Sequence, residues 1–139
     1  MRGKMAQNCN NFFEEQKDWS KRKLAIIKLY LFGFSKILGS STTQSCVYYV
    51  DGFAGKGIYD DNSKGSPVLA AEISQDYRNQ QKKYRLNCIN VEADNENFHN
   101  LEKSTTQFQG IVQNLNGSFS SQTPTILNII GKCPTFFFI

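Results

Sequence analysis

The sequence predicts an α/β fold in which helices cover both faces of a doubly wound parallel sheet. Short apolar runs alternate with segments of helical periodicity along the chain, as in proteins that interleave strands and helices. Residues 46–50 form an unbroken apolar run, which is typical of a strand buried on both faces of a parallel sheet. A glycine-rich segment, residues 52–57, follows that run directly, at the end of the strand where open α/β sheets bind ligands.

The first expected helix covers residues 20–38. Its apolar residues recur at helical spacing, at Leu24, Ile27, Leu31, Phe34 and Leu38. Asp18 or Ser20 can cap the start of this helix, and Gly39 is placed to end it. A Ser/Thr/Gln-rich linker, residues 40–45, then leads to the first strand.

The rest of the chain predicts three more strands, each preceded by a helix. In chain order, these are a helix at 67–79, a strand at 86–91, a helix at 94–104, a strand at 110–115, a helix at 125–130 and a strand at 135–139. Ser66 before Pro67 reads as an N-cap followed by proline in the first helical turn. Gly131 is placed to close the last helix.

The composition excludes several classes of protein. Hydrophobic residues make up 40% of the 139 residues and charged residues 20%, which indicates one globular domain. The most apolar stretch, residues 24–38, contains Lys28 and Lys36 and is too short to cross a bilayer. Residues 1–11 lack the apolar core of a signal peptide, so we expect a cytoplasmic protein. We expect residues 1–17 to be a flexible N-terminal arm and residues 18–139 to form the domain.

Positive charge is concentrated at the beginning of the chain. Residues 1–38 hold eight Lys and Arg against three Asp and Glu, whereas residues 39–139 hold eight against nine. Lys21, Arg22 and Lys23 fall in the first turn of a helix, where positive charge opposes the helix dipole. A solvated helix face explains these residues most simply. The alternative is a surface for a polyanion such as nucleic acid.

The cysteines and the single histidine give no metal-binding pattern. Cys9, Cys46, Cys88 and Cys133 include no Cys-x-x-Cys pair, so we expect no zinc knuckle. Cys46 and Cys88 fall in apolar strand runs, where a reduced cysteine packs as a small hydrophobic residue. Such reduced cysteines fit a reducing compartment. His99 excludes a multi-histidine metal site because the chain has no other histidine, and we expect it on a helix surface.

The segment after the first strand has the composition of a ligand-binding loop. Asp51 ends the strand, and Gly52, Gly55 and Gly57 follow, where glycine allows positive φ and close approach of backbone to a ligand. The glycine spacing matches neither a Walker A loop nor Gly-x-Gly-x-x-Gly, and a tight structural turn is an equal alternative. Glu92 ends the second strand, where a carboxylate can accept hydrogen bonds from two ribose hydroxyls. Together, these residues predict a nucleoside ligand.

Several sequence blocks carry a family resemblance. They are Trp19-Ser20-x-x-Lys23, Tyr48-Tyr49-Val50-Asp51-Gly52-Phe53-Ala54-Gly55-Lys56-Gly57, Gly65-Ser66-Pro67, Val91-Glu92 and Phe136-Phe137-Phe138-Ile139. Through these blocks, residues 12–139 resemble the three-Cys-motif partner proteins (TcmP), a bacterial family with the class I S-adenosylmethionine-dependent methyltransferase fold. The resemblance implies a Rossmann-like parallel sheet with the strand order three, two, one, four, then five to seven. This chain would supply the first four of these strands, after an N-terminal helix.

The resemblance also implies roles for individual residues. The loop around the methionine part of S-adenosylmethionine would consist of Asp51, Gly52, Phe53, Gly55 and Gly57. Glu92 would hold the ribose, at a spacing of 41 residues from Asp51 that exceeds the roughly 20 of a compact Rossmann unit. Ser118 stands where the family often has an acidic residue near the adenine. No residue of this chain is assigned a catalytic role.

In the family, the fourth strand runs into an Asp-Pro-Phe-Gly motif that faces the transferred methyl group. This sequence ends at Ile139, ahead of that motif, so we expect a truncated, cofactor-binding part of a methyltransferase-like protein. A neighbouring three-Cys-motif protein is the implied partner. The alternative function is a catalytically inert nucleotide-binding or protein-interaction module. The strand at 135–139 would be a bare sheet edge with three adjacent phenylalanines, so we also expect self-association.

Overall fold

A computed structural model describes the chain over residues 21–22, 24–34, 46–80 and 85–139. The expected arm at residues 1–17, the expected linker at residues 40–45 and Gly39 lie outside these ranges. Within the described part of the chain, the predicted α/β fold with a parallel sheet is confirmed.

The described strands form one sheet in which every neighbouring pair is parallel. The strands are β1 (Cys46–Asp51), β2 (Arg85–Glu92), β3 (Val112–Asn116) and β4 (Thr135–Phe138). Their order across the sheet is β3-β2-β1-β4, which is the order that the resemblance implied. Among the described strands, β4 is therefore terminal, as predicted for the strand at 135–139.

The carboxyl ends of the strands meet along one side of the sheet, called the carboxyl edge below. The register places Asp51 of β1 between Asn90 of β2 and Phe138 of β4. Asn90 in turn pairs with Asn114 of β3. The chain segments that leave these strand ends are therefore neighbours in space, although they are far apart in the sequence.

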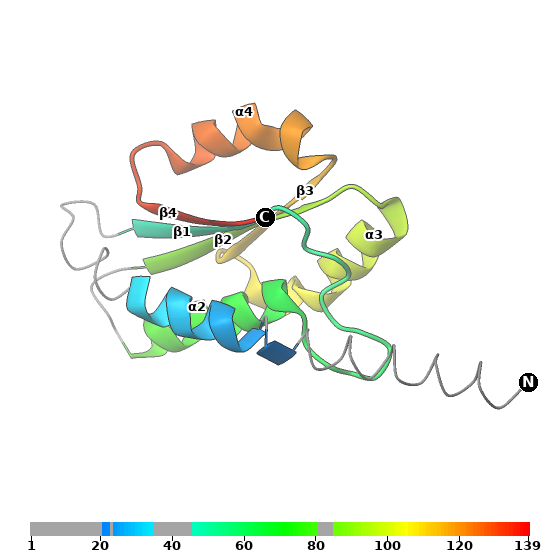
Figure 1. Cartoon of the computed structure of the whole chain (residues 1–139), viewed down its shortest axis with the longest axis horizontal. Helices are drawn as coiled ribbons and strands as arrows, with labels where there is room; N and C mark the ends of the chain where they lie inside the picture. Colours follow the sequence, from blue (N-terminus) through cyan, green and yellow to red (C-terminus); the bar gives the residue numbers. More distant parts are fainter. Residues whose placement is uncertain (1–20, 23, 35–45, 81–84) are drawn as a thin grey trace, which may run out of the picture.

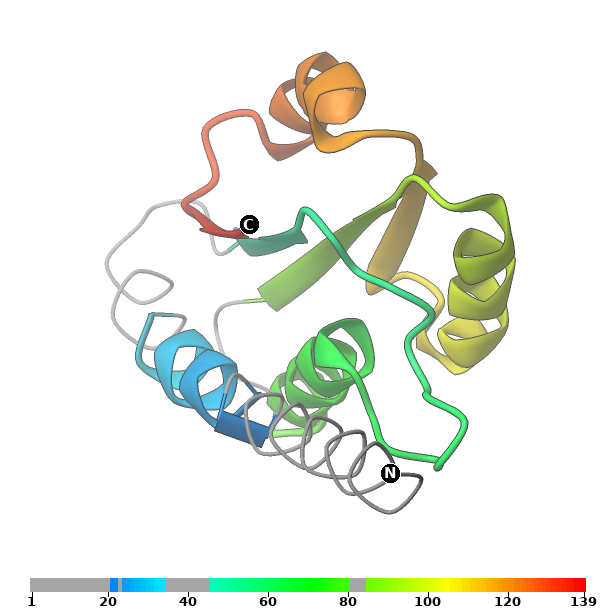
Figure 2. The ribbon, with the colours of Figure 1, turned by 45° about the vertical axis from the view of Figure 1, so that its right-hand side comes forward.

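Helices cover both faces of the sheet (Figure 1). They are α2 (Ser66–Asn79), α3 (Asn95–Ser104) and α4 (Phe119–Ile130), with a short 3-10 helix η1 (Thr106–Phe108) and further helical residues at 21–22 and 24–34. Figures 1 and 2 show α4 on one face, and α2, α3 and residues 24–34 on the other. The two sides are called the α4 face and the α2 face.

An apolar cluster fills the space on each side of the sheet. On the α2 face, Tyr49 and Leu86 of the sheet join Ile27 and Leu31, two of the residues whose spacing predicted the first helix. The cluster on the α4 face contains Val50, Ile89, Val91, Ile126 and Ile130. Because full burial of such a side chain is worth roughly 1.5–3 kcal/mol, the sheet depends on the helices of both faces.

The start of α3 lies within one residue of the predicted one, whereas the predicted cap of α2 is wrong. The Asp94 side chain caps α3 by accepting from the N–H of Asn97 at 2.8 Å. Ser66 does not cap α2, because it is already the first helical residue and Gly65 occupies the cap position. The Ser66 hydroxyl instead donates to the Asp51 carboxylate, a charged acceptor buried beside it.

The helix predicted at 125–130 begins earlier, at Phe119. Ser118 starts it, because its side chain accepts from the N–H of Ser121 at 3.1 Å. Pro124 then lies inside the helix, where a missing N–H and a steric clash cost about 3 kcal/mol. Burial of the apolar side of α4 against the sheet offsets that cost.

The prediction that Cys46 is a reduced packing residue is wrong. Cys46 forms a disulfide with Cys133, with a Cα–Cα distance of 5.8 Å. The pairing of β1 with β4 brings these residues together across a sequence separation of 87. Cys46 therefore gives no support to a reducing compartment. Cys88 is free and buried, as predicted, and burial raises the pKa of its thiol to about 12.

The described helices carry exposed polar side chains. No helix in the described ranges is long and apolar enough to cross a membrane. His99 lies exposed on α3, as predicted. Lys21 and Arg22 are exposed at the start of the described helical residues, while Lys23 lies outside them.

Candidate functional site at the carboxyl edge

The loop from β1 to α2, residues 52–65, crosses the carboxyl ends of β1 and β2 and is called the glycine loop. The N–H of Ala54 donates to the last-but-one carbonyl of β2 at 3.0 Å. The N–H of Gly55 donates to Oε2 of Glu92 at 2.7 Å. Oε1 of Glu92 accepts from the N–H of Asp94 at 3.1 Å. One carboxylate therefore ties the glycine loop to the segment that opens α3.

Asp51 supports the glycine loop from inside the protein. Its side chain is fully buried and lies on the α2 face. The hydroxyls of Tyr49 (3.2 Å) and Ser66 donate to Oδ2, and the N–H of Phe53 donates to Oδ1 at 3.2 Å. A buried carboxylate needs such donors, because burial without them would cost several kcal/mol. Asp51 therefore points away from the solvent side of the loop and fixes its first turn.

The charge of this buried carboxylate influences two tyrosines, Tyr49 and Tyr59. Burial raises the pKa of Tyr49, and the negative charge of Asp51 raises it further. Burial and the charge of Asp51 also raise the pKa of Tyr59, a half-exposed residue of the glycine loop. Both phenols therefore remain protonated at neutral pH, so that each can donate a hydrogen bond.

Two glycines of the loop adopt positive φ for different reasons. Gly55 has φ +72°, and a Cβ there would meet only the Tyr59 hydroxyl, at 3.9 Å, so the backbone is open on that side. Gly57 has φ +85°, and a Cβ there would lie 2.8 Å from the Ser104 Cβ. The first glycine leaves room for a ligand, whereas the second allows the loop to pack on α3.

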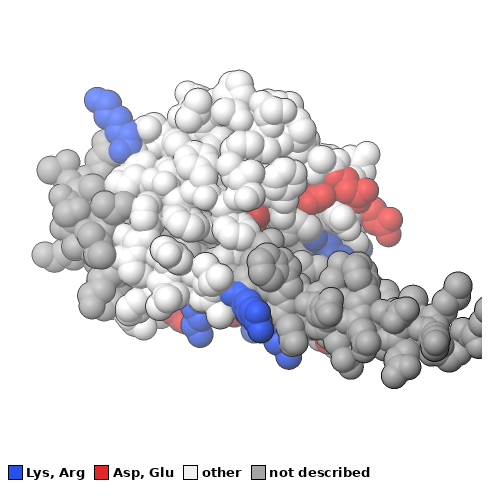
Figure 3. Space-filling model, in the orientation of Figure 1, with Lys and Arg blue, Asp and Glu red and all other residues white. Residues whose placement is uncertain are grey.

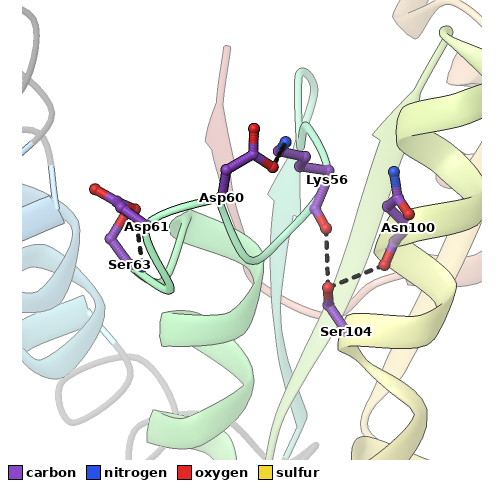
Figure 4. A network of polar contacts seen from close by, with 6 residues as sticks. All are labelled: Lys56, Asp60, Asp61, Ser63, Asn100 and Ser104. Atoms are coloured by element: carbon purple, nitrogen blue, oxygen red, sulfur yellow. Dashed lines mark hydrogen bonds and ion pairs between the residues drawn. The ribbon is translucent and has the colours of Figure 1, made fainter. Parts of the chain in front are cut away.

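A polar network fixes the outer part of the glycine loop to α3 (Figure 4). The Ser104 hydroxyl lies within hydrogen-bond distance of two carbonyls, that of Lys56 at 3.0 Å and that of Asn100 at 2.9 Å. The Lys56 ammonium group pairs with Asp60 at 2.6 Å. Because the Asp60 side chain is almost fully exposed, this ion pair contributes little stability. This ion pair also lies within the loop, so the hydrogen bond from Ser104 to the Lys56 carbonyl is the contact that attaches the loop to α3.

The remaining predicted residues also lie at the carboxyl edge. Gly52 continues the ladder beyond β1, because its N–H donates to the Phe138 carbonyl at 2.9 Å. Phe53 follows it with 67% of its surface exposed. Ser118 is exposed next to Gly117, whose N–H donates to the Glu92 carbonyl at 3.0 Å. The structure therefore gathers the predicted residues along one edge, but commits Ser118 to capping α4.

Four residues of this site were missed by sequence reasoning. Tyr49 was assigned only to a strand, Ser66 to a helix cap, and Tyr59 and Ser104 to no role. Strand alternation was an available signal, because residues 49 and 51 must face the same side of the sheet. No sequence signal places Tyr59 or Ser104, since their contacts depend on the path of the loop.

A separate hollow of about 310 Å³ lies on the α4 face, beside the beginning of β3. Its lining includes Tyr48, Asn87, Ile89 and Gln113, which are remote from the glycine loop in the register of the sheet. Among the described residues, no three His, Cys, Asp or Glu side chains are grouped as metal ligands.

The fold and the edge together define an α/β protein with a glycine loop anchored at the carboxyl ends of a parallel sheet. Comparisons with protein-family models, curated proteins and solved structures find no match for this chain.

Proposed function

We propose that the carboxyl edge binds a nucleoside-containing cofactor, S-adenosylmethionine, as in a methyltransferase-like protein of the three-Cys-motif partner family. The hydrogen bond between Gly55 and Glu92 carries this proposal, because it places a carboxylate and an open stretch of backbone side by side. The edge also lies outside the carboxyl ends of the strands, where ligands bind in open α/β sheets.

The residues at the edge fit such a ligand. A Cβ at Gly55 would occupy space that is otherwise open, so the bare backbone permits close approach. Each oxygen of Glu92 accepts one backbone N–H and has further acceptor capacity for a ribose hydroxyl. Phe53 offers an exposed aromatic surface beside the same loop. Asp51 would contribute indirectly, by fixing the backbone beneath the ligand.

S-adenosylmethionine would supply a methyl group on a sulfonium, which an acceptor displaces in line. The contribution of this chain would be to hold the donor in position, which is most of what a protein adds to such a displacement. We assign no residue to the acceptor or to proton transfer.

A catalytically inert module is the second candidate, and one observation favours it. Asp51 and Glu92 are both engaged by donors of the protein itself, so both already have a purely structural use. In this case, the glycine loop would be a structural turn, and the carboxyl edge would serve nucleotide binding without transfer or contact with a protein partner.

Calorimetry with S-adenosylmethionine and its demethylated product tests the proposal. We expect binding by the wild type, and at least tenfold weaker binding by Glu92→Gln, because a charged hydrogen bond is worth about 1.5–3 kcal/mol. Glu102→Gln is the matched control, since Glu102 is exposed on α3 and its side chain takes no part in the glycine loop. We expect this control to bind like the wild type.

The outcomes separate the two candidates. Absence of binding at millimolar ligand would favour the inert module. Binding that Glu92→Gln leaves unchanged would place the ligand elsewhere on the protein. Circular dichroism of both variants checks that the loss is not a loss of fold.

A further inference from the structure

A row of polar side chains crosses the α2 face of the sheet just beneath the carboxyl edge. Asp51, Asn90 and Asn114 are register neighbours on three adjacent strands, and alternation turns all three to the same face. Register neighbours on adjacent strands have Cβ atoms roughly 5 Å apart. Thr105, which follows α3, extends the row beyond the sheet, because Asn114 Nδ2 lies 2.9 Å from its hydroxyl oxygen.

Asn90 is the unusual member of this row. It is fully buried, and its Nδ2 lies 3.0 Å from Oδ1 of Asn114. Among the described residues, no donor reaches Oδ1 of Asn90. A buried acceptor without a donor loses its hydration and gains nothing in return, so such groups call for an explanation.

If the hydrogen bonds along the row run in the opposite direction, the Oδ1 of Asn90 gains a donor. The oxygen and nitrogen of an asparagine side chain exchange places by a half-turn of its last torsion, while the shape stays the same. If both asparagines turn, the Thr105 hydroxyl turns away from the Leu101 carbonyl, which keeps the N–H of Thr105 as its donor at 3.0 Å, and donates to Asn114 instead. Asn114 then donates to Asn90. The Asn90 NH₂ group then takes the place of the unpartnered Oδ1, and the register neighbour of Asn90 on β1 is the acceptor Asp51.

We propose that Asn90 is a positioning residue of the carboxyl edge, whose side-chain NH₂ donates to Asp51 beneath the glycine loop. The row Thr105–Asn114–Asn90–Asp51 then links the end of α3 to the carboxylate that fixes the first turn of the loop. This link goes beyond the proposed function, because it exists with or without a ligand.

A second carboxylate at position 90 tests the link through pH. At low pH, the new acid in Asn90→Asp is neutral, and its O–H donates a hydrogen bond to Asp51, as the amide N–H does. Asp51 then raises the folded-state pKa of the new acid above its unfolded value of about 3.9. Stability is therefore lost as pH rises from about 4 through that raised pKa, and it stays low above it.

We expect the Tm of Asn90→Asp to lie close to that of the wild type near pH 4. Near pH 8, we expect it to fall about 10 °C below the wild type, which corresponds to a shift of about two pKa units. Tyr49, Tyr59 and Cys88, which feel the charge of Asp51, all have raised pKa values and stay neutral in this range. The charges of Lys56 in the loop and Glu92 on β2 also influence the pKa of Tyr59. Both residues are present in the wild type and in Asn90→Asp, so they do not contribute to the difference in Tm.

One variant serves as the control. Asn87→Asp places the same charge three residues earlier on β2, where the Oδ1 of Asn87 accepts from Arg78 at 2.8 Å. We expect its Tm relative to wild type not to fall with pH, because the new charge meets a guanidinium.

A ligand-independent readout completes the test. In Asn90→Leu, the Asp51 carboxyl loses a donor, so its titration followed by ¹³C NMR should move to higher pH than in the wild type. An unmoved Asp51 titration, or a Tm difference of Asn90→Asp that is flat from pH 4 to pH 8, would overturn the proposal. Neither readout involves S-adenosylmethionine, so both stand apart from the proposed function.

Discussion

The glycine loop and the segment from residue 104 to residue 139 are held in place by different forces. Backbone and side-chain hydrogen bonds fix the loop, to Glu92 on one side and to Ser104 on the other. Residues 104–139 contain a single charged residue, Lys132, and Figure 3 shows a broad uncharged surface over α4. This segment relies on apolar packing, together with the disulfide at the start of β4.

The glycine loop positions the atoms of the candidate site, whereas residues 104–139 stabilise the fold. Hydrogen bonds to the loop fix the position of a few backbone atoms. Each contributes about 1 kcal/mol to stability, or about 1.5–3 kcal/mol where the partner is a charged group. The packed segment completes the sheet and carries α4, so its loss would expose both β1 and the apolar cluster on that face. Changes in the loop should therefore alter a site, whereas changes in the segment should alter the fold.

The largest expected effect is the loss of the disulfide. Cys46→Ser should lower the free energy of unfolding by about 4 kcal/mol, because the bond closes a long loop of the unfolded chain across a separation of 87 residues. Urea denaturation measures the change. A reducing agent should lower the wild type to the level of the variant and leave the variant itself unaffected. Equal stability of wild type and variant without reductant would show that packing alone holds β4.

The second expected effect contrasts two glycines within the loop. Gly57→Ala combines a left-handed backbone with a Cβ 2.8 Å from the Ser104 Cβ, so we expect a loss of about 3 kcal/mol. Gly55→Ala has the same kind of backbone but open space, so we expect a loss of about 1 kcal/mol. Thermal unfolding followed by calorimetry compares the two variants.

Ser104→Gly removes the atom in the way, so the double variant Gly57→Ala/Ser104→Gly should lose less than the sum of the two single losses. Equal losses in Gly55→Ala and Gly57→Ala would mean that the loop is not packed on α3. The loop would then be attached only through Glu92, and the contrast with the packed segment would be greater.

The strands were predictable from sequence, because unbroken apolar runs such as residues 46–50 require burial on both faces. The edge that holds Asp51 and Glu92 followed from strand ends, since parallel strands all end on the same side. The direction of the Asp51 side chain was also within reach, because alternation places it with buried Tyr49. The resemblance, in contrast, fixed the strand order, which periodicity could not supply.

Other features depend on the folded structure. The pairing of Cys46 with Cys133 needs β1 and β4 to be neighbours, and nothing local to either cysteine signals it. The early start of α4 was missed for another reason: it depends on a local cap by Ser118, whose position was assigned to a ligand because of the resemblance. A tertiary contact therefore decides the disulfide, whereas a local signal for α4 was overlooked.

The smallest expected effect concerns the outer side of β4. No described strand pairs with that side, and Phe137 and Ile139 remain 41% and 68% exposed. A sheet edge with apolar side chains and unpaired backbone groups is a template for association. We expect the wild type to self-associate at micromolar concentration, and Phe137→Lys to weaken this at least tenfold, or about 1.4 kcal/mol, because a charge at the edge must be desolvated. Sedimentation velocity over a range of concentrations measures both.

Leu29→Lys is the control, because it replaces an apolar side chain that is 71% exposed on the helical residues 24–34. It should associate like the wild type if β4 is the contact. A wild type that sediments as a 15.8 kDa monomer at these concentrations would contradict the prediction, and would mean that the uncharged segment is stable with its edge exposed.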